Sequence, residues 1–178
     1  MIANTPPQLI IDFWFEELSP KQHWVKDQHL DAEIQQRFGG LHQSAAAGEL
    51  SAWRESAEGR LAEILVLDQF SRNIYRDQAK SFSCDELAVA LAQEAVAVGA
   101  DLQLDAAKRS FLYMPYMHSE SLEIHQQALT LFSQPGLENN YDFELRHLAI
   151  IERFGRYPHR NIILGRNSTE QELTFLQQ

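Results

Sequence analysis

In this chain of 178 residues cysteine and long apolar runs are scarce, and each shortage excludes a class of protein. It contains a single cysteine, Cys84, which excludes an internal disulfide and favours a reducing compartment. Its longest apolar stretches are far shorter than the roughly 20 residues of a membrane-spanning helix. The first residues, MIANTPPQL, have neither the basic nor the apolar region of a secretory signal. We therefore expect a cytoplasmic protein that does not enter a membrane.

Positive charge is scarce as well, with 15 Lys+Arg against 25 Asp+Glu and a formal net charge of −10. Such a charge repels nucleic acid over long range, so we expect no nucleic-acid partner. A glycine-rich phosphate loop, a Gly-x-Ser-x-Gly elbow and an H-E-x-x-H pair are missing. Glu144 and His147 have the E-x-x-H spacing, but a di-iron bundle needs two such pairs plus two further carboxylates. We therefore expect no metal and no cofactor.

The pattern that is present is helical. Apolar residues recur at spacings of three and four, no segment reads as a strand, and the length suits one domain over residues 1–178. The pattern predicts an all-α fold of eight to nine helices packed as antiparallel hairpins. Prolines, glycines and capping residues place these helices near residues 6–18, 30–47, 57–74, 83–98, 105–115, 119–134, 140–154 and 168–176.

Several helix ends have specific signals. Pro115 is expected to end or kink its helix, because proline lacks the backbone N–H. Ser119 and Asn140 are expected to be N-caps of the helices that follow them. Ser168 and Gln171 have the spacing of a capping box for the last helix.

Three polar clusters interrupt the apolar pattern, and the first is LDQFSRNIYR, residues 67–76. Asp68, Arg72 and Arg76 follow at steps of four and share a helix face, with Asn73 in the adjacent row. An exposed Asp68–Arg72 pair contributes only about 0.3–0.5 kcal/mol. The apolar neighbours indicate burial instead, and a buried arginine must be paired or must bind something. Both interpretations remain open.

The second cluster, YMPYMHSE at residues 113–120, contains His118 and Glu120. Both are candidates for general acid/base catalysis. The alternative is structural: His118 is then a buried histidine with satisfied hydrogen bonds, and Glu120 favours the start of a helix.

The third cluster is RFGRYPHRN, residues 153–161, followed by Arg166. Arg153 and Gly155 are explained by the end of a helix, since cations favour that end and glycine terminates it. Four polar residues are not explained in this way: Arg156, His159, Arg160 and Asn161. They form either a hub of salt bridges to the protein's own carboxylates or an anion pocket, because arginine binds both carboxylate and phosphate in a bidentate manner.

Together these clusters resemble a bacterial family catalogued as domain of unknown function 924. The matching strings are IIDFWFEELSPKQHW, LVLDQFSRNIYR, YMPYMHSE and RFGRYPHRNIILGRNSTEQELTFL, which extend over nearly the whole chain. The resemblance implies an all-α fold of the tetratricopeptide-like superhelix type. It implies no reaction, substrate or cofactor.

Three hypotheses for function follow. In the first, the clusters converge in the hollow of a helical arc and bind a small anionic metabolite. The expected ligand-binding residues are Arg72, Asn73, Arg76, Arg156, Arg160 and Asn161, and the catalytic candidates are His118, Glu120 and His159. In the second, the protein is a scaffold that binds a peptide through an exposed aromatic groove near Phe13, Trp14 and Trp24. In the third, the clusters only fix the fold. The sequence does not indicate an oligomeric state.

Overall fold

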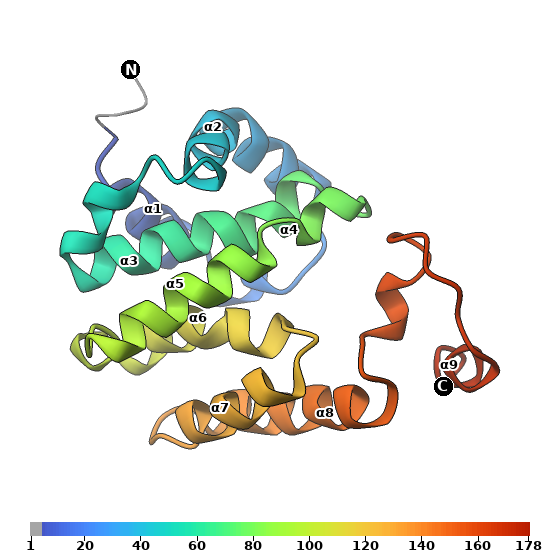
Figure 1. Cartoon of the computed structure of the whole chain (residues 1–178). Coiled ribbons are helices and arrows are strands. Elements are labelled where there is room, and N and C mark those ends of the chain that lie inside the picture. The colour runs from blue at the N-terminus through green and yellow to red at the C-terminus, as the bar shows by residue number, and fades with distance from the viewer. Residues whose placement is uncertain (1–4) are drawn as a thin grey trace.

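The computed structural model describes residues 5–178, and no strand occurs among them. The fold is all-α, as the sequence predicts (Figure 1). The α-helices are α1 (Gln8–Asp12), α2 (Gln28–Ala46), α3 (Ala57–Leu65), α4 (Ser71–Ile74), α5 (Asp85–Ala97), α6 (Ala106–His118), α7 (Leu122–Phe132), α8 (Glu138–Phe154) and α9 (Glu170–Phe175). No helix of this part of the chain is long and apolar enough to cross a membrane.

The helices are stacked broadly in chain order (Figure 1). α3 packs against α1, α5 and α6, and α2 packs against α4. α6, α7 and α8 then pack each against the next, at the opposite end of the molecule from α2. The chain after α8, residues 155–178, lies to one side and carries α9. This order of packing is compatible with a tetratricopeptide-like arrangement.

The central helix predicted over residues 57–74 is present, but it is interrupted in the middle by a π-helical turn at Val66–Phe70. Every residue from 61 to 70 is buried, including Asp68 and Gln69. A π-turn is wider than an α-turn, and such turns are frequent at functional sites. The turn therefore holds a carboxylate in the protein core.

The N-terminal aromatic residues form part of that core. Phe13 and Trp14 are each 1% exposed, and the Phe13 ring centroid lies 4.9 Å from that of Phe38. The exposed groove that the scaffold hypothesis needs at Phe13 and Trp14 is therefore not formed. Trp24 differs from them, because it is 62% exposed.

The helix ends around His118 differ from the sequence-based expectation. α6 does not end at Pro115, which lies buried inside it, but continues to His118. Packing on both sides can hold a helix together where proline removes a single hydrogen bond. Ser119 closes α6 instead of opening the next helix, and α7 follows Ser121. Ser119 Oγ accepts a hydrogen bond of 3.1 Å from the Ser121 N–H.

The N-caps of two further helices differ from the predicted ones: that of α8 is Leu137, three residues before Asn140, and that of α9 lies one residue later than predicted. α8 begins at Glu138, so Asn140 is not its N-cap. The capping box of α9 is Thr169 with Glu172, one residue beyond the predicted pair. Glu172 is 2% exposed and pairs with Arg156, 16 residues away, so this tertiary contact helps to fix the register. The predicted end of α8 is confirmed, because Gly155 has a φ of 68° there, a conformation that glycine adopts without strain.

Candidate functional site

His118, the last residue of α6, lies against the π-turn of the central helix. Its Nδ1 is 2.7 Å from Asp68 Oδ1. The Asp68 side chain is 1% exposed, whereas that of His118 is 18% exposed. The structure thus joins the first and second polar clusters in a histidine–aspartate pair whose aspartate is sealed in the core.

This pair fixes the proton of the imidazole. An ionised carboxylate can only accept, so Nδ1 carries the hydrogen and donates it to Asp68. Within residues 5–178, His118 Nε2 has no hydrogen-bond partner. The atom is not sealed from solvent. Nε2 is therefore an accessible acceptor, as general-base chemistry requires.

The electrostatics favour a neutral histidine beside a charged aspartate. Burial and the nearby Arg72 guanidinium lower the pKa of His118, and attraction to Asp68 only partly offsets them. Burial alone would raise the pKa of Asp68, but attraction to His118 and Arg72 and the hydrogen bonds outweigh it, so this pKa is lowered. At neutral pH His118 can therefore take up a proton.

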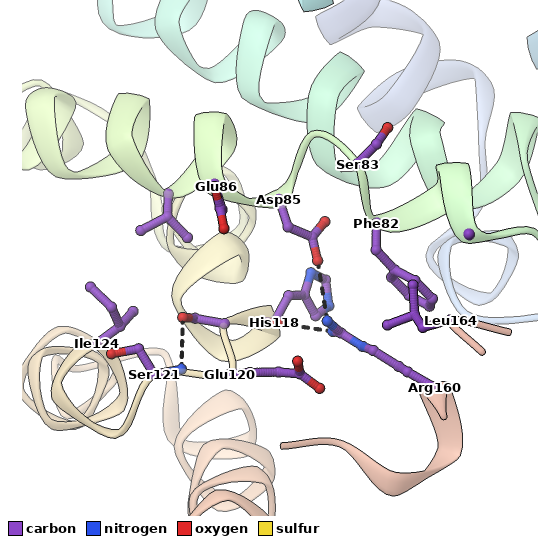
Figure 2. A pocket seen from close by; sticks show the side chains of 13 residues that line it. Phe82, Ser83, Asp85, Glu86, His118, Glu120, Ser121, Ile124, Arg160 and Leu164 are labelled. Atoms are coloured by element: carbon purple, nitrogen blue, oxygen red, sulfur yellow. Dashed lines mark hydrogen bonds and ion pairs between the residues drawn. The ribbon is translucent and has the colours of Figure 1, made fainter. Parts of the chain in front are cut away.

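Two arginines and a second aspartate complete the network. Arg72 Nη1 donates to Asp68 Oδ1 at 3.1 Å, and Arg72 also makes a bidentate pair with Asp85 at 2.9 and 3.0 Å. Arg160 reaches the same place from the chain after α8 (Figure 2). Its Nη2 donates to the His118 carbonyl oxygen at 2.8 Å, and its Nη1 lies 3.4 Å from Asp85 Oδ2. All three polar clusters therefore contribute to one charge-balanced network.

Arg160 is incompletely satisfied in this network. It is 6% exposed, and its Nε is buried with no hydrogen-bond partner in the described part of the chain. Its guanidinium carbon lies 4.4 Å from the centre of the Phe82 ring and 4.7 Å from that of Tyr157. Burial lowers the pKa of Arg160, and attraction to Asp85 works against this. The two aromatic rings hold the guanidinium in position.

His118 lines three hollows of the protein surface. The first, here called the Arg160 hollow, has a volume of about 560 Å³ and lies between the start of α5 and the chain after α8 (Figure 2). Three carboxylates line it, those of Asp85, Glu86 and Glu120. An anion would meet these carboxylates as well as Arg160.

The second hollow, called the Arg76 hollow, is smaller, with a volume of about 190 Å³. Its lining consists of His23, Trp24, Val25, Gln69, Arg72, Asn73, Arg76 and His118. It thus combines two arginines with amides and imidazoles, and it includes no carboxylate.

The arginines of the Arg76 hollow are anchored from behind. Arg76 makes a bidentate pair with Asp31 of α2, through Nε at 2.5 Å and Nη2 at 2.8 Å, and Asn73 Nδ2 donates to the same carboxylate at 2.8 Å. Arg76 Nη1 and Arg72 Nε have no partner among the described residues and are not sealed from solvent. Arginine side chains that are fixed in position and keep free N–H groups can donate hydrogen bonds to an anion.

The third hollow, called the Trp24–Phe143 hollow, has a volume of about 740 Å³ and is mainly apolar. Its lining consists of Trp24, Met114, Met117, His118, Asn139, Asn140, Phe143 and His147. It shares Trp24 and His118 with the Arg76 hollow.

The structure does not bring Arg156 and Asn161 to these hollows. Arg156 forms a bidentate pair with Glu172 at 2.7 and 2.9 Å. Asn161 donates to Glu172 Oε2 at 3.3 Å and accepts from Arg166 Nε at 2.9 Å. These contacts match the salt-bridge hub that the sequence leaves open as an alternative.

The other two catalytic candidates lie in different surroundings. Glu120 lines the Arg160 hollow but accepts from Arg166 at 2.7 and 2.9 Å and from the Tyr157 N–H at 2.7 Å. Burial raises the pKa of Glu120, but these hydrogen bonds lower it by more, so the group is ionised at neutral pH. His159 is exposed and lines none of the three hollows.

Sequence reasoning missed Asp31, Asp85, His23 and Gln69. Asp31 and Asp85 each lie in the first turn of a helix, where an acidic residue has an ordinary explanation that conceals its distant arginine partner.

Glu144 of the E-x-x-H pair binds His125 Nδ1 at 2.6 Å. Over residues 5–178 no group of three or more His, Cys, Asp or Glu side chains is arranged to hold a metal ion.

Comparison with known proteins gives two matches. The profile of the family described as "Bacterial protein of unknown function (DUF924)" matches residues 10–178. The solved structure titled "Structure of Protein of Unknown Function ATU0120 from Agrobacterium tumefaciens" has a TM-score of 0.91 and 38% sequence identity, and the match covers 96% of each chain. No curated protein matched.

Proposed function

The chain belongs to the bacterial family of unknown function DUF924, and we propose that it binds a small anionic molecule beside His118, which acts as a general base. The observation that carries the proposal is the Arg76 hollow. Two anchored arginines with free N–H groups and an asparagine line it next to an accessible imidazole nitrogen, and its lining has no carboxylate. This combination supports an anion site more strongly than the carboxylate-lined Arg160 hollow does.

In the proposed chemistry, Arg76 Nη1 and Arg72 Nε donate to the anionic group. The bound molecule, or a water beside it, presents a proton to His118 Nε2. Asp68 accepts from Nδ1 throughout and stabilises the imidazolium that forms. A positioned general base of this kind typically contributes about 10²- to 10⁴-fold to a rate.

Inorganic phosphate tests the anion site directly. We expect phosphate to bind wild-type protein by calorimetry and to raise the pKa of His118 in an NMR titration, because a nearby negative charge favours imidazolium. Arg76→Lys keeps the positive charge but removes the free Nη1, so it should weaken phosphate binding about tenfold or more and reduce the pKa change.

Arg37→Lys is the matched control. Arg37 also forms ion pairs with carboxylates, Glu17 and Glu33, but it lines none of the three hollows. This variant should bind phosphate like the wild type. Phosphate that leaves the pKa of His118 unchanged, or that binds the two variants equally, would refute the proposed site.

A further inference from the structure

We infer that the anionic ligand also has an apolar body, an aromatic ring or a short acyl chain, which occupies the Trp24–Phe143 hollow. This inference rests on the proposed function and specifies its ligand as an amphipathic anion, with a carboxylate or phosphate group at one end.

The Arg76 hollow is too small for a complete metabolite. Sites for small molecules usually have volumes of about 300–1,000 Å³, whereas this hollow has about 190 Å³, enough for an anionic group alone. The rest of a bound molecule must extend into a neighbouring space. The Arg160 hollow is lined by Asp85, Glu86 and Glu120, so an anion gains less there.

The Trp24–Phe143 hollow adjoins the Arg76 hollow, because Trp24 and His118 line both. A molecule that occupies the two hollows would therefore lie beside His118. The Trp24–Phe143 hollow has a volume of about 740 Å³, which is sufficient for one or two rings. A bond next to the anionic group would therefore be within reach of His118 Nε2.

The chemistry of this hollow suits an apolar body. Trp24 stacks on Phe111 with ring centroids 5.6 Å apart and an interplanar angle of 15°, yet it remains 62% exposed. Phe143 also lines the hollow and is 51% exposed, and the buried Met114 and Met117 contribute to the lining. Methionine adapts its shape to different apolar partners. Exposed aromatic rings beside thioethers form a surface that gains from being covered.

Polar groups at this hollow would orient substituents on the body. His147 Nδ1 donates to the Phe143 carbonyl oxygen at 2.7 Å, which leaves its Nε2 as an acceptor. The amides of Asn139 and Asn140 also line the hollow. A few placed polar groups in a mainly apolar lining are typical of sites for small molecules.

The test compares acetate, 2-naphthoate and 2-naphthol by calorimetry. Acetate tests the anion site alone, and 2-naphthol tests the apolar hollow alone. We expect 2-naphthoate to bind at least about tenfold more tightly than acetate. Phe143→Ala should weaken 2-naphthoate about fivefold to tenfold and leave acetate unchanged, because a ring–ring contact is lost. Arg76→Lys should weaken both carboxylates.

Leu145→Ala is the matched control, because Leu145 is 43% exposed on the same helix and lies outside the hollow. Equal affinities for acetate and 2-naphthoate would overturn this inference and leave the anion site intact. If 2-naphthoate and 2-naphthol bind equally and Arg76→Lys affects neither, the proposed function fails.

A second copy of the chain is the other candidate for covering Trp24 and Phe143. Light scattering measures the oligomeric state of the wild type and of Phe143→Ala, and so distinguishes a second copy from a small ligand. A dimer that dissociates on this substitution, with unchanged affinity for 2-naphthoate, would overturn the inference.

Discussion

Asp68 accepts hydrogen bonds from Gln69, Arg72 and His118 while its own side chain is 1% exposed. A charge in such a position is tolerated only when partners replace the lost water. Those partners come from the same helix and from α6, so the carboxylate joins two elements. It also sets which nitrogen of His118 is free.

Asp68→Asn tests this role. An asparagine has a similar shape but no charge, and it leaves Arg72 with one fewer carboxylate. We expect the variant to unfold with a free energy about 3 kcal/mol lower than the wild type, as for other broken buried ion pairs. We also expect the pKa of His118 to fall further, since attraction to Asp68 raises it. Denaturant unfolding and NMR titration measure the two effects.

Asp77→Asn is the control for charge removal. Asp77 pairs with Lys26, but their side chains are 69% and 57% exposed, so the loss of stability should be much smaller than for Asp68→Asn. If Asp68→Asn were as mild as this control, Asp68 would not organise the site.

At the scale of elements, a set of polar contacts attaches the chain after α8 to the body. Arg166 pairs with Glu120, and Arg160 reaches Asp85 and the His118 carbonyl oxygen. Tyr157 is 1% exposed, and its hydroxyl donates to the Met117 carbonyl oxygen at 2.5 Å. These contacts place one wall of the Arg160 hollow.

Glu120→Gln should loosen this attachment. The substitution removes the charge that Arg166 faces and replaces one of the two acceptor oxygens with an NH₂ donor, so the opening free energy of residues 156–178 should fall by about 1–3 kcal/mol. Hydrogen exchange measures it as faster exchange in that segment, while α3 and α6 stay protected. Glu123→Gln, at an exposed position in the first turn of α7, should exchange like the wild type. Faster exchange throughout the molecule would contradict a local attachment.

At the scale of the whole molecule, pH acts on two sets of buried groups. Burial lowers the pKa values of His23, His42 and His118. Hydrogen bonds and ion pairs lower those of Glu120 and Glu172, the latter to about 2 through Arg156 and the Thr169 N–H. In every case the unfolded chain binds protons more readily than the folded chain, so stability falls as the pH falls.

We therefore expect the free energy of unfolding to decrease in two ranges. The histidine range begins below about pH 6.5, the ordinary value for this group, and the carboxylate range extends from about pH 4.5 down to about pH 2. The net charge of −10 is relieved on acidification, which acts in the opposite direction, but salt at 0.15 M screens such dispersed repulsion.

Urea unfolding at several pH values in 0.15 M salt measures this dependence. His118→Gln should reduce the decrease between pH 7 and pH 5, because one group no longer takes up a proton on unfolding. His29→Gln, an exposed histidine, should leave the profile unchanged. A profile that rises on acidification would show that surface repulsion dominates.

Local chemistry made part of this architecture predictable. The helical class follows from apolar spacing, and the end of α8 follows from Gly155. The Asp68–Arg72 pair follows from a step of four residues. The π-turn was not predictable, because backbone hydrogen bonding to the fifth residue leaves no mark in the apolar pattern. The apolar neighbours of Asp68 indicated a buried segment, but they did not indicate its contact with His118.

Composition and residue spacing are enough to predict a helical, acidic protein with three clusters of multi-donor side chains. Which clusters meet depends on how distant segments pack. Arg72, Arg160 and His118 converge, whereas Arg156 and Asn161 bind Glu172 away from them. Helix formation depends on neighbours within one turn, whereas the partner of a buried charge is set by packing between segments that are distant in the chain.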